Sequence, residues 1–328
     1  MYIKAGFFVF LLQNLDMKFY VGVVFFILLS CSSNSTVLNR TNEVDLNAIK
    51  ETLFYLSSDE LQGRKSGEAG NVLASEFLIN KMEDYQVKPL FASFKDTLTN
   101  FPNTWNVVGL LPGTDKILKD EYIVLGAHYD HIGLKKQMND NEDIIANGAN
   151  DNASGVAILT EITRYLSKSE LKRSVIIAYF TAEEDGLLGS EHLAEKLKSE
   201  GYNVGLMLNF EMLGVGMDRN YLAYLTGYDK SNLADIIHSK KINLIGYFEG
   251  ESERSLFKRS DNYPFYLEFG TPSHTFSSFD FENYPYYHHV KDEYKEMDLK
   301  HIEAFTKDIA PVVQELINAP LGLIKNNK

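Results

Sequence analysis

Histidines and carboxylates stand at five points of the sequence where an apolar run ends or the next element begins. The five segments read "GAHYD", "NGANDNASG", "FTAEED", "NFEMLG" and "YYHHV". Their candidate functional residues are His128, Asp130, Asp151, Glu183, Glu184, Glu211, Tyr287 and His288. Histidine combined with carboxylate, without sulfur, suits zinc and, less selectively, manganese or cobalt. The number of donors suggests two metal ions that share one carboxylate.

Glu183 and Glu184 are neighbours just after an apolar run. Two like charges this close repel each other and raise the pKa of at least one of them. An isolated pair of this kind is ordinarily part of a solvated loop. Together with the other four segments, the pair instead predicts two roles. One glutamate binds a metal, while the other points the opposite way and acts as a base toward metal-bound water.

The spacing of apolar residues predicts the elements that hold these segments. Buried strands are expected at 103–111, 121–128, 173–180, 204–210, 220–227 and 270–278. Amphipathic helices are expected at 44–58, 70–85, 152–169, 190–201 and 297–319, the last with a kink at Pro311. Strands that alternate with helices indicate an α/β fold with a single mixed, largely parallel sheet sandwiched by helices. Ligands bind at the carboxyl ends of strands in such sheets, so the five segments should meet there.

Composition and net charge bear on which partners the chain can bind. The chain has 328 residues and a formal net charge of −13, without a run rich in lysine and arginine. This argues against a nucleic-acid partner, because phosphate backbones recruit basic patches. No internal repeat or second domain boundary is visible, so one domain is expected over residues 46–320.

The N-terminal residues predict export. The stretch "MKFYVGVVFFILLSC" begins at Met17 with one lysine and runs through apolar residues to Cys31, which fits a signal peptide. We expect a signal peptide over 1–30, for which Met17 is an alternative start, and a polar tether over 31–45. The ending "LLSC" resembles a bacterial lipobox, which implies a lipid anchor at Cys31 and an outer-membrane location facing the periplasm or the exterior. Cys31 is the only cysteine, so a disulfide framework and a cysteine-ligated metal site are both excluded.

The five segments, in this order, resemble the di-zinc aminopeptidase family, whose relatives include glutaminyl cyclases and glutamate carboxypeptidases. The stretches "SSDELQGRKSGEAG" and "RSDNYPF" also look familial, and the resemblance spans roughly residues 46 to 318. It implies a zinc exopeptidase fold, two zinc ions, and hydrolysis of the N-terminal peptide bond of peptide substrates.

The resemblance also implies a role for each matching residue. His128 matches the histidine ligand of one zinc, Asp151 the bridging aspartate and Glu184 the ligand of the other zinc. Glu211 stands where the family commonly has aspartate, and His288 matches the last ligand in a "YHxxxD" pattern that ends at Asp292.

The remaining roles surround these ligands. Asp130 matches the carboxylate that orients His128, a partnership expected on physical grounds, and Glu183 matches the general base. In some members a tyrosine at the position of Tyr287 stabilises the oxyanion, whereas a packed aromatic ring is the alternative here.

Two other functions remain open from the sequence. A glutaminyl cyclase would use a single zinc, and a binding domain of the same fold would use none. The complete set of five predicted ligands favours the peptidase over both. Outside that set, His131, His274 and His289 are interpreted as ordinary polar residues.

Overall fold

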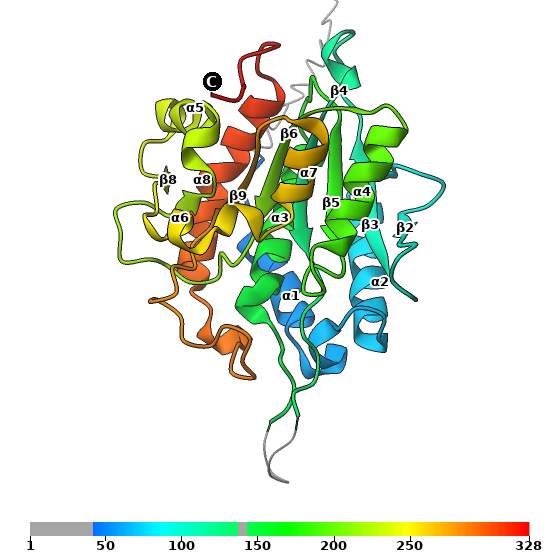
Figure 1. The fold of residues 1–328 in the computed structure, drawn as a ribbon, viewed down its shortest axis with the longest axis vertical. Helices are drawn as coiled ribbons and strands as arrows, with labels where there is room; N and C mark the ends of the chain where they lie inside the picture. Colours follow the sequence, from blue (N-terminus) through cyan, green and yellow to red (C-terminus); the bar gives the residue numbers. More distant parts are fainter. Residues whose placement is uncertain (1–41, 137–142, 328) are drawn as a thin grey trace, which may run out of the picture. The chain divides into compact units, whose positions relative to one another are not determined.

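The computed structural model describes residues 42–136 and 143–327. In these ranges the chain forms a nine-stranded sheet in the order β1-β3-β5-β4-β6-β9-β7-β8, and β2 also pairs with β3 (Figure 1). The strands are β1 (Lys88–Pro89), β2 (Lys95–Thr97), β3 (Trp105–Leu111), β4 (Glu121–His128), β5 (Val175–Phe180), β6 (Asn203–Phe210), β7 (Ala223–Leu225), β8 (Ile245–Gly246) and β9 (Ser273–Ser277). The α-helices are α1 (Leu46–Leu56), α2 (Ala69–Asp84), α3 (Gly155–Ser167), α4 (Leu188–Ser199), α5 (Leu233–Lys240), α6 (Gly250–Arg254), α7 (Asn262–Phe269) and α8 (Leu299–Ile317).

The centre of the sheet is parallel. Strands β5, β4, β6 and β9 are neighbours that run in the same direction. Toward the edges, β3 pairs antiparallel with β5, and β7 pairs antiparallel with β9. The predicted fold class, a mixed sheet with a parallel core covered by helices, is therefore confirmed.

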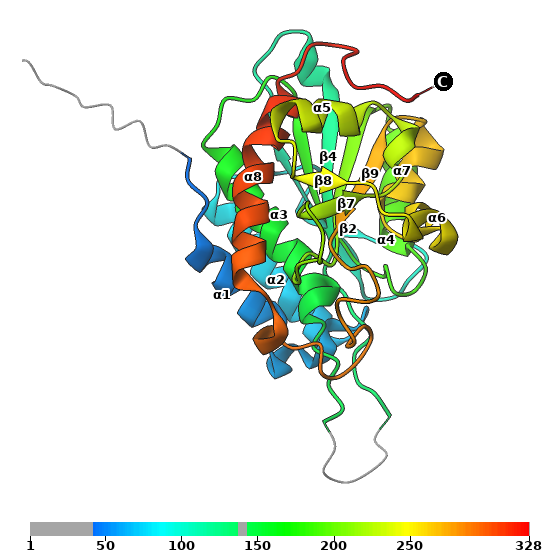
Figure 2. The same cartoon turned by 90° about the vertical axis from the view of Figure 1, so that its left-hand side faces the viewer.

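Helices cover both faces of the sheet. In Figure 2, α1, α2, α3 and α8 lie on one side of the strands, and α4 and α7 lie on the other. Side chains of successive strand residues alternate between the two apolar layers, as the period of two requires. In β5, Val175, Ile177 and Tyr179 join the larger cluster, while Ile176, Ala178 and Phe180 join the smaller. Burial on both faces explains why the strand reads as a continuous apolar run.

Close packing at the centre of the sheet requires one glycine. A Cβ atom at Gly126 in β4 would lie 2.4 Å from the ring of Phe180 in the neighbouring strand. The absence of a side chain there lets the Phe180 ring lie across β4, close to the point where β4 reaches His128. Gly126, which the packing requires, and His128, a candidate ligand, therefore lie within three residues of β4.

The structure contains elements that the apolar spacing did not predict. They are the strands β1, β2 and β8, of two or three residues, and the helices α5, α6 and α7, of five to eight residues. Elements this short span too few turns or alternations to show a period. The predicted helix over 297–319 is present as α8, and Pro311 lies within it.

The described chain starts shortly before α1. Asp45 caps this helix by accepting the backbone N–H groups of Asn47 and Ala48, and the Asn42 side chain donates to the backbone of Tyr165 and the hydroxyl of Ser169. Within the described residues, no helix has the length and apolar character needed to span a bilayer. The predicted signal peptide over 1–30 and its Cys31 lie outside those residues.

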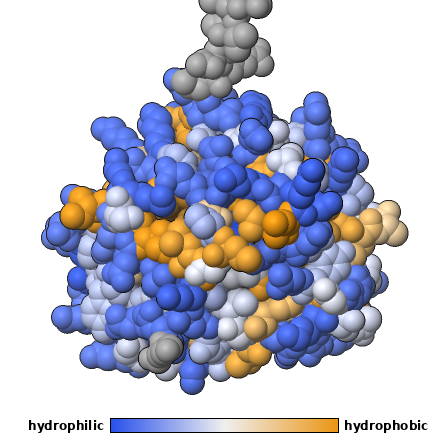
Figure 3. All heavy atoms as spheres, turned by 90° about the horizontal axis from the view of Figure 1, so that it is seen from above, coloured by the Kyte–Doolittle hydropathy of each residue, from blue (hydrophilic) through white to orange (hydrophobic). Residues whose placement is uncertain are grey.

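Figure 3 looks onto the end of the sheet at which the parallel strands begin. Apolar side chains form a band there among hydrophilic ones. Exposed apolar side chains in segments at this end include Ile117, shortly before β4, and Leu321, after α8. This surface is separate from the carboxyl ends of the strands.

His274 in β9 supports a prediction about stability and pH. Its buried ring donates from Nδ1 to the carbonyl oxygen of Thr226 and accepts at Nε2 from the hydroxyl of Ser231. Burial lowers the pKa of His274 to about 4. Because the unfolded chain then binds this proton more readily, the stability tied to neutral His274 is complete above about pH 6.5 and is lost as pH falls toward 4.

We therefore expect the stability advantage of the wild type over His274→Gln to shrink by about 2 kcal/mol between pH 7.5 and pH 4.5. Urea unfolding of both proteins at the two pH values measures this difference. His289→Gln, which changes an exposed histidine, is the matched control. An equal wild-type advantage at both pH values would contradict the prediction.

Candidate metal centre

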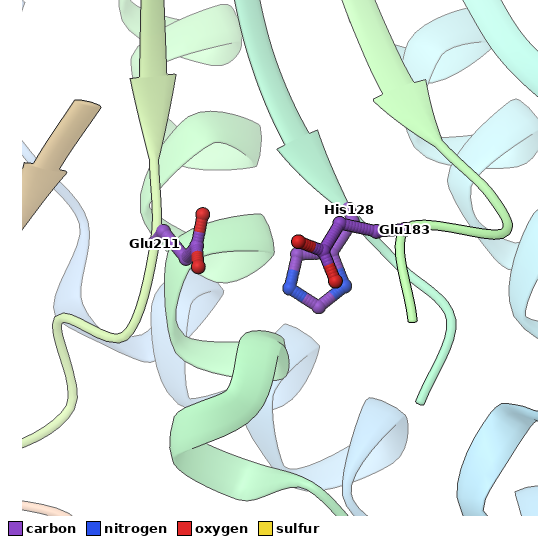
Figure 4. A group of neighbouring side chains, drawn as sticks. All are labelled: His128, Glu183 and Glu211. Carbon is purple, nitrogen blue, oxygen red and sulfur yellow. The ribbon is translucent and has the colours of Figure 1, made fainter. Parts of the chain in front are cut away.

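The polar segments meet at the carboxyl ends of the parallel strands. His128 is the last residue of β4, Glu211 directly follows β6, and Glu183 follows β5 after a short turn (Figure 4). The turn before α3 supplies Asp151, and the loop between β9 and α8 supplies His288. Segments that are far apart in the sequence are thus brought together by the strand order.

One group of donors consists of His128, Glu183 and Glu211. A ligand atom from each lies within 4.8 Å of the others. The Glu211 carboxylate accepts the hydroxyl of Ser260 and, at 3.1 Å, the side-chain N–H of Asn209. These two bonds fix the carboxylate beside the histidine, while the Nε2 atom of His128 has no hydrogen-bond partner in the described chain.

A second group consists of His131, Asp151 and Glu184, again with ligand atoms within 4.8 Å of one another. The Nδ1 atom of His131 lies 2.8 Å from Glu184 Oε1. His288 also faces this group, because its Nε2 atom lies 3.0 Å from Glu184 Oε2 and 3.2 Å from Asp151 Oδ2. The second group therefore offers two histidines and two carboxylates.

Asp151 lies between the two groups. Its Oδ1 atom is 3.3 Å from Nε2 of His128, and its Oδ2 atom is 3.2 Å from Nε2 of His288. One carboxylate oxygen is thus directed to each side, which is the arrangement needed to bridge two cations.

Asp130 holds the turn that carries the glutamate pair. Its carboxylate accepts the backbone N–H groups of Glu183 and Glu184 at 3.2 and 3.3 Å, and the hydroxyl of Ser66 at 3.1 Å. The same carboxylate lies 3.6 Å from Nδ1 of His128. One buried aspartate therefore fixes both adjacent glutamates, whose side chains serve different donor groups.

Asp292 anchors the turn that carries Asp151. Its two oxygens accept the backbone N–H groups of Asn150 and Asp151 at 2.7 and 3.0 Å, and the hydroxyl of Tyr284 donates to it at 2.7 Å. The sequence pattern used Asp292 only to locate His288, four residues earlier. The structure shows that it also positions the central carboxylate.

Two asparagines connect the same turn to the loop after β6. The Asn152 side chain donates to the carbonyl of Phe210 and accepts the backbone N–H of Met212, and the Asn150 side chain accepts the backbone N–H of Gly214. These bonds fix the turn of Asp151 relative to the loop that carries Glu211. Together with Asn147, whose side chain donates to the Asp59 carboxylate, they account for the asparagines of the "NGANDNASG" segment.

Arg64 is a buried cation beneath the site. Its guanidinium donates to the carbonyl oxygens of Tyr129 at 2.8 Å, Asn147 at 2.6 Å and Gly148 at 3.1 Å, and also to that of Leu56. Burial lowers the pKa of Arg64 to about 10, so the group remains charged at neutral pH. It binds both the end of β4 and the approach to Asp151, and the sequence analysis assigned it no role.

The site separates carboxylates that are easily ionised from those that are not. Although burial opposes ionisation of Asp151, the facing histidines His128, His131 and His288 hold its pKa well below the usual range. Burial raises the pKa of Glu183 well above the usual range, and His128 only partly offsets this effect. Glu183 is thus a carboxylate suited to taking up a proton, and Asp151 one suited to binding cations.

A pocket of about 550 Å³, part of it open to solvent, adjoins these groups. Its lining includes the carboxylates of Asp151, Glu183, Glu184 and Glu211. It also includes apolar and aromatic side chains, which are Met212, Leu256, Phe279, Phe281 and Tyr287. The ring of Tyr287 stacks on that of His288, with centroids 4.0 Å apart. A peptide chain end in the pocket would therefore meet both acidic donors and apolar contacts.

Of the three histidines interpreted as ordinary polar residues, His131 is the one that the structure places in the site. It is buried and faces Glu184, whereas the ring of His274 bonds to Thr226 and Ser231, and the ring of the exposed His289 accepts the backbone N–H of Lys291. A signal was available in the sequence, because His131 follows Asp130 in the loop that leaves the end of β4.

Comparison with known proteins gives the family. A model of Peptidase family M28 matches residues 106–313, which is more than half of the chain. The chain therefore belongs to Peptidase family M28. The resemblance inferred from the five motifs is confirmed at the level of the family.

Individual curated relatives match only part of the chain. Leucine aminopeptidase 1 of Metarhizium robertsii is 28% identical over 193 residues, which cover 56% of this chain and 46% of that protein. The chain spans between 18% and 59% of the length of such curated relatives.

Solved structures share the fold. A zinc aminopeptidase from Bacillus subtilis superimposes with a TM-score of 0.66 at 15% identity, over 84% of this chain and 96% of that one. The glutaminyl cyclase of Bacteroides thetaiotaomicron superimposes with a TM-score of 0.61 at 17% identity, over 83% and 98% of the two chains. At these identities the likeness shows the fold alone, which both activities use.

Asp292→Asn tests how strongly the anchored turn governs the site. The asparagine presents an NH₂ group to one of the two backbone N–H donors, so the turn that carries Asp151 should shift. We expect the affinity for zinc to fall about 10- to 100-fold, as for other residues that orient metal ligands. Zinc occupancy measured across chelator-buffered free zinc concentrations gives this value. Asp45→Asn, at the cap of α1, should leave it unchanged, and equal losses in both variants would contradict the assignment.

Proposed function

We propose that the protein is a zinc-dependent exopeptidase that hydrolyses the N-terminal peptide bond of peptides. The observation that carries this proposal is the position of Asp151 between two donor groups, with Glu183 beside them at the pocket. The carboxylate of Glu183 accepts no hydrogen bond from the described residues, so it is free to act on a bound molecule. The name of the Metarhizium relative, leucine aminopeptidase 1, supports the same reaction.

The donor set fits two zinc ions. His128, Asp151 and Glu211 would hold one, and Asp151, Glu184 and His288 would hold the other, with His131 close to the second. Imidazole and carboxylate donors without thiolate are a normal zinc set. The Nε2 atom of the buried His128 makes no hydrogen bond in the described chain and lies 3.3 Å from Asp151 Oδ1, so both atoms are placed to bind one cation.

Glu183 would carry the proton in the reaction. When bound, the two zinc ions would polarise the scissile carbonyl and make a water molecule more acidic. The Glu183 carboxylate would take a proton from the attacking water and deliver it to the nitrogen of the leaving amine. Burial, which raises its pKa, makes the protonated form accessible between these two transfers.

Tyr287 would assist at the carbonyl oxygen. It lines the same pocket as Glu183, and burial raises the pKa of its hydroxyl, so the group stays protonated and able to donate. A hydrogen bond from Tyr287 would stabilise negative charge as it develops on that oxygen.

Glu183→Gln tests the reaction and the metal content together. The variant should keep the fold and close to two zinc ions per chain, while kcat for aminoacyl fluorogenic substrates falls by about 10²–10⁴-fold. Elemental analysis and steady-state kinetics measure the two quantities. Wild-type turnover in the variant would remove Glu183 as the base. One zinc per wild-type chain would favour a cyclase, and none would favour a binding domain.

The proposal extends to location. We propose that the chain is exported and anchored through lipid on Cys31, with the domain held at the outer membrane by residues 31–45. The support is the sequence "LLSCSS" after an apolar run. The several acyl chains of a bacterial lipoprotein make such an anchor stable, because a single chain binds only marginally.

Cys31→Ser tests the anchor. In a bacterial host, the variant should leave the membrane fraction or accumulate as an unprocessed precursor, whereas the wild type should incorporate radiolabelled palmitate. Cys31 is the sole cysteine, so palmitate incorporated into the wild type at a cysteine must be attached to this residue. A wild type that takes up no palmitate and is cleaved elsewhere would remove the lipoprotein assignment.

A further inference from the structure

Arg259 differs from the other arginines of the described chain. Its guanidinium has no hydrogen-bond or ion-pair partner among the described residues. The others each contact a carboxylate or a backbone carbonyl: Arg64, Arg164, Arg173, Arg219 and Arg254. Arginine carries five N–H donors in a planar fork, and an arginine without a protein partner is available to a ligand.

The backbone around Arg259 is fixed to the metal centre. Its N–H group donates to the carbonyl of Leu256 at 3.0 Å, and the next residue, Ser260, is buried with its hydroxyl against the Glu211 carboxylate. Consecutive Cα atoms are about 3.8 Å apart. The base of the Arg259 side chain is therefore one step from a residue that contacts the donor groups, and only the side chain itself is free to move.

Arg259 also lines the pocket that adjoins the donor groups. Among the described lining residues it is the one lysine or arginine, it is exposed, and the lining also includes Leu256, Phe279 and Phe281. The four carboxylates of the lining belong to the proposed metal and proton machinery. A molecule in the pocket thus has one positively charged side chain of the lining within reach.

We infer that Arg259 binds a carboxylate of the peptide substrate and thereby selects for acidic substrates. This rests on the proposed exopeptidase function, because the pocket is taken as the substrate site. A guanidinium and a carboxylate form two parallel N–H···O bonds, which give direction as well as affinity. The carboxylate has two possible sources on a peptide: the side chain of an acidic N-terminal residue, or the C-terminal group of a dipeptide.

Two pairs of substrates separate these sources. Leu-Gly and its C-terminal amide differ only in the terminal carboxylate. The amides of Glu-Gly and Gln-Gly differ only in the N-terminal side chain. The zinc-loaded full-length protein is assayed with all four as wild type, Arg259→Gln and Lys258→Gln. Lys258 is exposed and adjacent but does not line the pocket, so its variant removes the same charge without removing the contact.

In one of the pairs, the wild type should cleave the acidic member with a kcat/KM about tenfold or more above that of its neutral partner. Arg259→Gln should bring this ratio close to one, and Lys258→Gln should keep it. The inference is overturned if the wild type shows no acidic preference in either pair, or if Arg259→Gln keeps the wild-type ratio.

Failure of the proposed function has a different outcome. If the wild type cleaves none of the four peptides, hydrolysis of N-terminal bonds is wrong, and binding then decides the inference. Calorimetry of the four peptides with Glu183→Gln, and with Glu183→Gln combined with Arg259→Gln, should show tighter binding of an acidic member only when Arg259 is present. Equal binding in both proteins overturns the role of Arg259.

Discussion

The site depends on keeping many carboxyl groups together at the end of one sheet. Seven lie there, and they are Asp130, Asp151, Glu183, Glu184, Glu211, Asp292 and the buried Asp261, whose charge helps to raise the pKa of Glu183. Burial weakens screening and penalises each charge, so such a cluster exists only where other groups compensate it. Backbone N–H groups provide part of this compensation at Asp130 and Asp292, three histidines provide part at Asp151, and the buried Arg64 adds a positive charge below.

The carboxyl groups of the site are not stabilised equally. This difference separates the carboxylates that support the turns from the carboxyl group that can react. The carboxylates of Asp130 and Asp292 accept hydrogen bonds from backbone N–H groups and thereby hold the two turns of the site. Glu183 receives no hydrogen bond from the described residues, and burial raises its pKa well above the usual range. Burial also raises the pKa of Asp261, to about 7, but Asp261 does not line the pocket, whereas Glu183 does. Glu183 is therefore the carboxyl group best placed to exchange a proton with a bound molecule. The proposed zinc ions would offset the charge that the protein itself leaves unbalanced.

Much of the fold and of the candidate site was predictable from the sequence, because strands buried on both faces form a continuous apolar run and end at polar residues. The central strands, the covering helices and the meeting of His128, Asp151, Glu184, Glu211 and His288 follow from that pattern and from the edge at which parallel strands end. What was missed depends on contacts that spacing does not reveal. The role of Arg64 rests on backbone carbonyls from two distant segments, and the short helices around Arg259 have too few turns to show a period.

The hydrogen bonds around the turn of Asp151 join segments that are far apart in the sequence. This turn is held by Arg64 from before α2, by the loop after β6 and by Asp292 from just before α8, so its contacts close loops of very different length. Closing such loops costs conformational entropy, which the packing of the complete fold must offset. A chain that has not yet placed its last segment against the sheet lacks the support of its central carboxylate. Any activity of the site is therefore confined to chains that have finished folding.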